Sequence, residues 1–263
     1  MDQYCSSFVQ WLACCCGRGD KIGRSILGSN PARILEARQA GSDLVGLPVP
    51  CLYMKRILIA TTNPGKLRDF RGAAASFGIE IASLPNLGDL PEVTEDGPTF
   101  EANARKKAEA YSRYAPGEMV IADDSGLEVD GLGGAPGVHS ARYAAEAPLS
   151  GSGNATDEAN NARLLRELKD VPPLRRTARF VCLIAAARAG RTLHVVRGEA
   201  EGTILDTPRG QQGFGYDPLF YCPSMGKTFA ELTLEEKARY SHRGAAFRKF
   251  LAWYSREADC DHA

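Results

Sequence analysis

Two adjacent carboxylates, Asp123 and Asp124, are the side chains of this sequence most suited to chemistry. They begin the segment Asp123-Asp124-Ser125-Gly126 and follow the apolar run of residues 119–122, so we expect a buried strand that ends in an acidic turn. Carboxylates at such a turn suit Mg²⁺, which usually takes one or two of them. Close carboxylates also push each other's pKa apart, which leaves one able to act as a base. The alternative is an Asp-rich turn with a structural role only.

A second candidate lies earlier in the chain, where a strand runs through a tight turn into a helix. A helix N-terminus has unpaired N–H groups and a dipole that favours anions, and Lys66 adds a full positive charge. The segment lacks the G-x-x-x-x-G-K-[ST] phosphate loop, so a plain turn with a solvated lysine is an equal alternative. The candidate phosphate-binding residues are Thr61, Thr62, Asn63, Pro64, Gly65 and Lys66.

A third set of polar residues surrounds the start of the next predicted helix. Glu95 can supply a second carboxylate to the same metal. Asn103 and Lys107 are four residues apart, so they share one face of the helix and can face a phosphate. A capped helix with solvated charges is the favoured alternative when this segment is taken alone.

Aromatic and basic residues in the later part of the chain suit a nucleobase. Aromatic rings in a Gly-rich loop can stack on a base, and a neighbouring carboxylate can accept hydrogen bonds from its ring N–H groups. Arg and His can donate to an exocyclic oxygen of the base, and Lys to phosphate. The candidates are Phe214, Gly215, Tyr216 and Asp217 in the loop, and Lys237, His242 and Arg243 beyond it. Each signal alone is weak.

The elements that must position these residues alternate between strands and helices. Apolar runs and capping signals predict strands at 57–62, 80–84, 119–122, 178–186 and 192–200, helices at 66–77, 99–114, 157–168 and 245–255, and a loop that leads into a strand over 213–221. Of the strands at 178–186 and 192–200, we expect the first to be interior and the second more polar. This order predicts an α/β protein with a mixed sheet.

Composition limits the classes of function. The 263 residues include 32 basic and 32 acidic side chains, so no global charge attracts nucleic acid or an anionic membrane, and an anionic ligand must be held locally. The clean apolar run at 180–187 is far shorter than the roughly 20 residues that cross a bilayer. Three Cys residues follow Met54, too few for a disulfide framework. We therefore expect a cytoplasmic enzyme.

Residues 1–53 differ in texture from the rest. They hold a Cys triplet at 14–16 and show weak periodicity, whereas Met54 leads directly into a strand-like run. We expect 1–53 to be a poorly structured extension or an upstream-start artefact, and 54–263 to be the functional domain. A thiol site in the Cys triplet is the alternative, but adjacent Cys residues lack the spacing of structural zinc sites.

From Met54 to about Tyr254 the chain resembles the inosine triphosphate pyrophosphatases. Five separated motifs carry the resemblance in the same order: Thr61-Thr62-Asn63-Pro64-Gly65-Lys66, Ala122-Asp123-Asp124-Ser125-Gly126-Leu127, the stretch from Gly133-Gly134-Ala135-Pro136-Gly137 to Ser140-Ala141-Arg142-Tyr143, residues 213–218, and Ser241-His242-Arg243-Gly244. The first motif has Thr62 where the family has Gly, which costs strain if that position needs a positive φ.

The resemblance implies a fold and an activity. The fold would be an elongated mixed sheet with flanking helices, in two lobes with a cleft between them. The activity would be Mg²⁺-dependent hydrolysis of ITP, dITP and XTP to the monophosphate and pyrophosphate, in a homodimer, which removes non-standard purines from the nucleotide pool. Asp124 would accept the proton of the attacking water, with Asp123 as the next candidate.

The resemblance also implies roles for the other candidates. Residues 61–66 would bind the triphosphate, Glu95 and Asp124 the metal, Ser125 and Lys107 phosphate, and 214–217, Lys237, His242 and Arg243 the nucleotide and its base. Two alternatives stay open: a sensor that binds nucleotide without turnover, and a pyrophosphatase for other altered nucleotides such as modified pyrimidines. No residue pattern explains how the 2-amino group of guanine would be rejected.

Overall fold

The computed structural model describes residues 56–145 and 154–260, with the backbone alone for 258–260. The prediction for residues 1–53 lies outside the described residues. None of the helices in these two ranges combines the length and hydrophobicity that a bilayer crossing requires.

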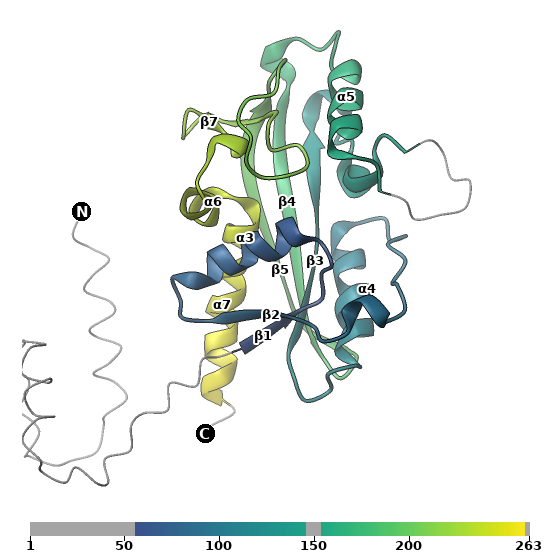
Figure 1. Ribbon diagram of the computed structural model, residues 1–263, viewed down its shortest axis with the longest axis vertical. Helices are drawn as coiled ribbons and strands as arrows, with labels where there is room; N and C mark the ends of the chain where they lie inside the picture. Colours follow the sequence, from purple (N-terminus) through teal and green to yellow (C-terminus); the bar gives the residue numbers. More distant parts are fainter. Residues whose placement is uncertain (1–55, 146–153, 261–263) are drawn as a thin grey trace, which may run out of the picture. The chain divides into compact units, whose positions relative to one another are not determined.

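A seven-stranded mixed sheet forms the centre of the described fold, in the order β2-β1-β3-β4-β5-β6-β7 (Figure 1). The strands β1, β2 and β3 pair in parallel, and the remaining pairs are antiparallel. The strands are β1 (Arg56–Ile59), β2 (Glu80–Ser83), β3 (Val120–Val129), β4 (Thr177–Arg188), β5 (Arg191–Ile204), β6 (Phe220–Cys222) and β7 (Lys227–Thr228). The mixed α/β fold predicted from the sequence is confirmed.

Five α-helices surround the sheet in the described part of the chain: α3 (Pro64–Ala75), α4 (Phe100–Ser112), α5 (Asp157–Glu167), α6 (Leu234–Tyr240) and α7 (His242–Cys260), to which short 3₁₀ turns are added. The 3₁₀ turns are η2 (Leu87–Asp89), η3 (Asp130–Leu132), η4 (Gly137–Arg142), η5 (Pro173–Arg175) and η6 (Phe229–Glu231). Helix α6 was not predicted, although Thr233 and Glu236 form a capping box at its start.

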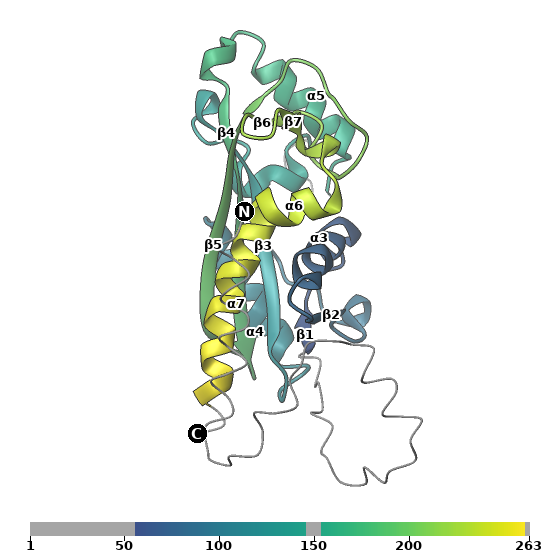
Figure 2. The same ribbon diagram turned by 90° about the vertical axis from the view of Figure 1, so that its left-hand side faces the viewer.

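The α-helices cover different parts of the sheet (Figures 1 and 2). Helices α3 and α7 pack on one face, where Phe70 and Phe247 meet Ile121 and Ile184. Helix α4 covers the other face, where the sheet contributes a second apolar cluster. A third cluster joins α5 to β6 and to the far ends of β3, β4 and β5. The long strands β3, β4 and β5 contribute to all three clusters. They therefore connect the part of the sheet covered by α3, α7 and α4 to the part beside α5.

Strand lengths and helix ends differ from the sequence predictions in ways that bear on the site. Strand β1 ends at Ile59, so Thr61 and Thr62 lie beyond it and not within a strand that reaches residue 62. Helix α7 begins at His242, three residues before the predicted start, because the Ser241 hydroxyl accepts a hydrogen bond from the N–H of Gly244. Strand β4 is buried along nearly its whole length, whereas β5 carries more polar and more exposed residues, as predicted.

Helix α7 approaches β5 closely at Gly198. A Cβ atom at this position would lie 2.3 Å from the main-chain N of Ala246 and 2.3 Å from the main-chain O of His242. Only glycine permits this approach. It brings the first turn of α7, which carries two of the candidate residues, down onto the sheet.

Candidate functional site

The acidic segment lies inside strand β3 and not in a turn, which corrects the sequence prediction. Asp123 and Asp124 pair with Ile184 and Leu183 of β4, and the pairing continues as far as Val129. Ser125 and Gly126 are residue types common in turns, but apolar residues on both sides of the segment favour one continuous strand once β4 pairs with it.

One edge of the acidic segment has no partner strand among the described residues. Strand β1 pairs with β3 only through Val120 and Ile121, whereas β4 follows β3 along its other edge. A cavity of about 460 Å³ borders the segment and is lined by residues from both ends of the sheet. The carboxylates therefore reach the cavity from the edge of a strand.

Side chains of adjacent strand residues point to opposite faces, and this separates the two carboxylates. Asp123 lies on the α3/α7 face, where Lys66 Nζ is 3.0 Å from its Oδ2 and Arg243 Nε is 3.9 Å away. Asp124 lies on the α4 face, where its Oδ2 accepts a hydrogen bond from Asn103 Nδ2 at 2.9 Å. Its Oδ1 accepts from the N–H of Ser125 at 2.9 Å.

The different surroundings shift the pKa values of the two carboxyl groups in opposite directions. Burial opposes ionisation of Asp123, but the charges of Lys66 and Arg243 outweigh it and hold its pKa below the ordinary value. Burial raises the pKa of Asp124, and the nearby charge of Glu95 raises it further, against the opposing effect of Lys107. Asp123 is thus a permanently charged partner of two cations, whereas Asp124 holds a proton more readily.

The start of helix α3 is capped by its own N-cap residue. Asn63 Oδ1 accepts hydrogen bonds from the N–H groups of Gly65 at 2.8 Å and Lys66 at 3.0 Å, and Pro64 occupies the first helical position. These two N–H groups are therefore already paired within the protein. Thr61 Oγ1 accepts from the N–H of Asn63 at 3.2 Å, which fixes the turn before the helix.

Thr62 fits its position without backbone strain. Among the described residues other than glycine, only Asn86 and Ala189 have a positive φ. A threonine therefore replaces the family's glycine here without entering the left-handed region.

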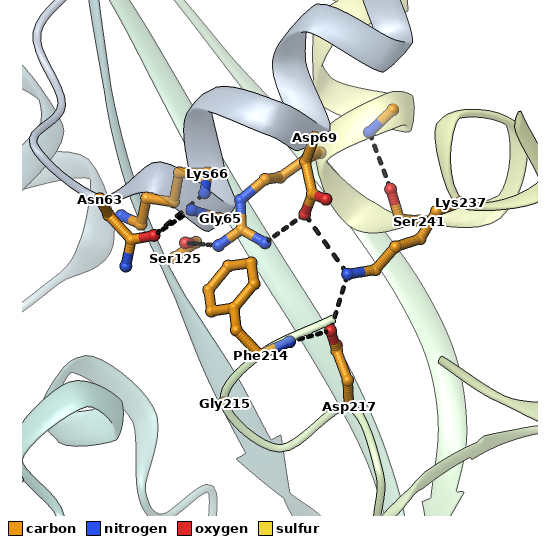
Figure 3. Close-up of polar contacts among 12 residues, drawn as sticks. Asn63, Gly65, Lys66, Asp69, Ser125, Phe214, Gly215, Asp217, Lys237 and Ser241 are labelled. Carbon is orange, nitrogen blue, oxygen red and sulfur yellow. Dashed lines mark hydrogen bonds and ion pairs between the residues drawn. The ribbon is translucent and has the colours of Figure 1, made fainter. Parts of the chain in front are cut away.

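Gly65 allows the loop that carries Phe214 to pack against the start of α3. A Cβ atom at Gly65 would lie 2.5 Å from a ring carbon of Phe214, so any larger residue would displace the ring. The ring also lies near two cations, with Arg243 Cζ 4.9 Å and Lys237 Nζ 5.3 Å from its centroid. Figure 3 shows Phe214 between the start of α3 and Asp217. Phe214 lines the cavity, where its ring can meet a flat ligand.

A network of buried charges lies beside Phe214 (Figure 3). Lys237 Nζ lies 2.6 Å from Asp217 Oδ2 and 3.5 Å from Asp69 Oδ2. Arg243 donates to Asp69 Oδ2 at 3.2 Å and to Ser125 Oγ at 2.7 Å. Removing one member of such a network leaves an unpaired buried charge, which is costly. The network thus fixes Arg243 and Asp217 relative to β3.

Asp69 was missed by the sequence analysis. It follows Lys66 by three residues, so both lie on one face of α3, and an Asp inside a helix is unfavourable unless it serves a purpose. That spacing was the available signal. The paired cations lie far away in sequence, at 237 and 243, so the role of Asp69 needs the fold to become visible.

Tyr216 and His242 are more deeply packed than the sequence analysis expected of groups that bind a base. Tyr216 belongs to the apolar cluster beside α5, and its hydroxyl donates to the main-chain O of Ser140 at 2.8 Å. His242 is 1% exposed and stacks on Phe180, with 4.7 Å between ring centroids. Burial and the charge of Arg243 lower the pKa of His242 well below its ordinary value, so its ring is neutral at pH 7.

The remaining carboxylate and cation lie on the α4 side of the cavity. Lys107 Nζ is 2.9 Å from Glu95 Oε2, and both residues line the cavity with Asp124. Two carboxylates that border one cavity are a suitable place for a hard cation, and Mg²⁺ usually takes one or two. Within 56–145 and 154–260, no group of three or more His, Cys, Asp or Glu is arranged to hold a metal. The donor set fits Mg²⁺ with phosphate and water ligands and does not fit a metal enclosed by protein.

Most of the predicted site residues meet at this one cavity. Its lining includes Thr61, Thr62, Asn63, Lys66, Glu95, Lys107, Asp123, Asp124, Ser125, Phe214, Gly215, Tyr216, Asp217, His242 and Arg243. Four predicted residues stand behind the lining: Pro64, Gly65, Asn103 and Lys237. Their contacts hold lining residues in place, as Asn103 does for Asp124.

Helix α5 contributes residues that the sequence analysis did not single out. Asp157 Oδ2 accepts from the N–H of Gly215 at 2.6 Å, and Asn161 Nδ2 donates to its carbonyl at 3.0 Å. The two side chains hold both sides of Gly215 and so position the loop of Phe214. In the sequence, Asp157 and Asn161 could be recognised only as polar residues on one face near the start of a predicted helix, which is a weak indication of a role in the site.

Comparisons with known proteins show which family this chain is similar to. The Ham1 family matches residues 57–253. The dITP/XTP pyrophosphatase of Geobacillus kaustophilus is 53% identical over 196 residues, which cover 74% of this chain and 92% of that protein. The dITP/XTP pyrophosphatase of Bacillus subtilis is 46% identical over 198 residues, which cover 75% and 96%.

Solved structures match over the same part of the chain. The Ham1 protein of Staphylococcus aureus is 40% identical, with a TM-score of 0.64, over 77% of this chain and 100% of that one. A dITP/XTP pyrophosphatase from Mycobacterium abscessus is 42% identical, with a TM-score of 0.57, over 74% and 98%.

Proposed function

The chain belongs to the Ham1 family, and from that premise we propose that it hydrolyses dITP, ITP and XTP to the nucleoside monophosphate and pyrophosphate. The family relationship confirms the resemblance to inosine triphosphate pyrophosphatases that the motifs predicted. The observation that carries the proposal is Asp124: a buried carboxylate, held by Asn103, beside a cavity that also holds Lys66, Lys107 and Glu95.

Asp124 acts as the proton acceptor in the proposed reaction. A water oxygen attacks the α-phosphorus, the bond from this phosphorus to the bridging oxygen of the β-phosphate breaks, and the water proton passes to Asp124. A carboxyl group whose pKa is raised is a better base near neutral pH than an ordinary one. Asn103 keeps the carboxylate oriented, since its amide donates to Oδ2.

Lys66 and Lys107 bind phosphate oxygens, and Asp123 holds Lys66 in place from the opposite face of β3. Residues Thr61 to Asn63 and Ser125 border the same space. Asp124 and Glu95 would hold Mg²⁺, which would supply positive charge that offsets the charge of the triphosphate. The ion pairs Lys66–Asp123 and Lys107–Glu95 hold both ammonium groups in place before substrate binds.

The base binds between Phe214 and the start of α7, with Gly215 to Asp217 and Lys237 fixing the loop. Arg243 lines the cavity there, and a guanidinium has only donors. The 6-oxo group of hypoxanthine or xanthine offers an acceptor, which suits these donors. The 6-amino group of adenine offers another donor, which cannot pair with a guanidinium N–H. This supports a preference for 6-oxo purines over adenine.

Product analysis with the full-length protein tests the function. The protein is incubated with Mg²⁺ and ITP, dITP, XTP, ATP or dUTP, and pyrophosphate and orthophosphate are measured separately. We expect pyrophosphate and monophosphate from the 6-oxo purine nucleotides and little from ATP. Orthophosphate release would indicate a phosphatase, binding of ITP without turnover would indicate a sensor, and a preference for pyrimidines would indicate a different substrate class.

Three further expectations are part of the proposal. A homodimer is expected from the family resemblance, and sedimentation equilibrium of the full chain would measure the mass. The domain boundary near residue 54 predicts that a chain starting at Met54 retains folding and activity, and loss of either would assign residues 1–53 a role. A cytoplasmic location is testable by fractionation of the source cells.

A further inference from the structure

Arg142 differs from the other cations that line the cavity. Lys66 pairs with Asp123, Lys107 with Glu95 and Arg243 with Asp69. In the described part of the chain, Arg142 has no carboxylate partner, and its hydrogen bond is to the main-chain O of Glu95, with NH2 3.0 Å away. A guanidinium carries five N–H donors, and the described residues occupy only one nitrogen of this group, NH2.

The backbone around Arg142 is held firmly on both sides. Before it, Ser140 Oγ accepts from the N–H of Leu127 at 2.9 Å and donates to the main-chain O of Gly137 at 2.6 Å. After it, Asn160 Oδ1 accepts from the N–H of Ala144 at 2.7 Å. The guanidinium thus extends from a fixed segment of the α5 region to Glu95, which lies beside α4. A side chain fixed at both ends loses little freedom when it binds a ligand.

The place of Arg142 within the cavity indicates which part of the nucleotide it meets. It contacts Glu95, which pairs with Lys107 on the α4 side, near Asp124. Phe214 and Arg243 lie on the other side, over the α3/α7 face. If the base lies near Phe214 and the α-phosphate near Asp124, the phosphates beyond it continue toward Glu95 and Arg142.

We propose that Arg142 binds the two terminal phosphates of the substrate and the pyrophosphate that leaves, an inference that rests on the proposed function. A planar guanidinium pairs with two phosphate oxygens at once, which a lysine does not do. Arg142 can do so without breaking an ion pair, whereas Lys66 and Lys107 must share their charge with carboxylates. It therefore favours nucleotides that carry a complete triphosphate.

Binding of the two products to the full-length protein tests this role. The variants are Arg142→Met and Arg142→Lys, with Arg105→Met as a matched control, since Arg105 forms an exposed pair with Glu101 outside this cavity. Calorimetry in Mg²⁺ measures the Kd of pyrophosphate and of IMP. For Arg142→Met we expect pyrophosphate to bind about tenfold more weakly or worse, IMP to bind within about twofold of wild type, and Tm to be unchanged. Arg142→Lys should recover part of the affinity, and the control should match wild type.

Two results would overturn the inference. Unchanged pyrophosphate affinity with a higher Mg²⁺ requirement would limit Arg142 to holding the carbonyl of Glu95. Equal weakening of IMP and pyrophosphate, with a lower Tm, would give it a structural role. The binding measurement needs no turnover, so its result is separate from the test of the proposed function. The proposed function would fail if the wild-type protein released no pyrophosphate from any 6-oxo purine triphosphate. The affinities for pyrophosphate and IMP would still decide the role of Arg142.

Discussion

On the α3/α7 face of the sheet Asp123 lies beside two cations, whereas on the α4 face its neighbour Asp124 is held by an amide and a backbone N–H. The two side chains are chemically identical and similarly buried, at 2% and 6% exposed. Their pKa values nevertheless move in opposite directions, because only Asp123 is in direct contact with ammonium and guanidinium groups. The two residues lie on opposite faces of one strand, and this gives them different roles: Asp123 is a structural charge and Asp124 is a candidate base.

The largest effect should come from Asp124→Asn. The change is nearly isosteric and keeps an acceptor for the amide of Asn103, but it removes the basic oxygen, so we expect kcat to fall by about 10³-fold or more. Pyrophosphate release from dITP measures it, and the melting temperature should stay close to wild type. Near-normal kcat would move the base to Asp123 and reverse the comparison.

Asp123→Asn should instead act mainly on stability. It removes the ion-pair partner of Lys66 and one of the two carboxylates near Arg243, which keeps Asp69, so the free energy of unfolding should fall by about 3 kcal/mol. Chemical denaturation measures this fall. An unchanged denaturation midpoint would mean that Lys66 and Arg243 find other partners. The surroundings of Asp123 and Asp124 would then differ less than the ion pairs indicate.

The contrast between the faces also marks the limit of sequence reasoning. The mixed α/β fold and most of the cavity lining follow from periodicity and motifs, because each depends on local patterns. The acidic segment was placed in a turn, since Ser125 and Gly126 are turn formers, and pairing with β4 overrides that preference. If the strand predicted at 119–122 had been extended through Asp124, the alternation of side chains along a strand would have placed Asp123 and Asp124 on opposite faces.

Other parts of the site depend on contacts between distant segments. Asp69 becomes meaningful only when residues 237 and 243 fold against α3, and Asp157 only when its helix meets Gly215. Helix α6 is a different case, because its capping box was legible in the sequence and was overlooked.

Glu95→Gln should change the metal requirement of the α4 face. Removing one carboxylate of the proposed pair should raise the Mg²⁺ concentration for half-maximal activity by about tenfold, and excess chelator should abolish turnover in both proteins. Titration of Mg²⁺ at saturating dITP measures the shift. Glu101→Gln is a suitable control, since Glu101 pairs with Arg105 away from the cavity. Equal titrations for Glu95→Gln and wild type would remove Glu95 from the metal site.

Phe214→Leu should affect substrate binding on the α3/α7 side more than the chemical step. Stacking of a base on an aromatic ring contributes about 1–3 kcal/mol, so KM for dITP should rise about tenfold, with a smaller change in kcat. Steady-state kinetics with dITP separates the two constants. A fall in kcat as large as the rise in KM would show that the loop also positions the reacting phosphate.

The smallest effect concerns pH and the neutral ring of His242 on the same side. Its pKa is lowered by burial, so below about pH 6.5 the unfolded chain takes up a proton that the folded protein refuses. Stability therefore falls as the pH drops through that value, by at most about 1.4 kcal/mol per pH unit for one proton. His194, whose pKa is also lowered by burial, contributes with the same sign from a less buried position.

Denaturation between pH 5 and 7, in steps, compares His242→Gln with His194→Gln. The background from other groups cancels when each variant is compared with wild type at the same pH. The His242 variant should show the flatter pH profile, because its ring is enclosed by Phe180 and Phe229 and cannot reach solvent when protonated. If both variants kept the wild-type slope, protonation of His242 would be accommodated within the stack, and the α3/α7 face would tolerate a further positive charge beside Arg243 and Lys237.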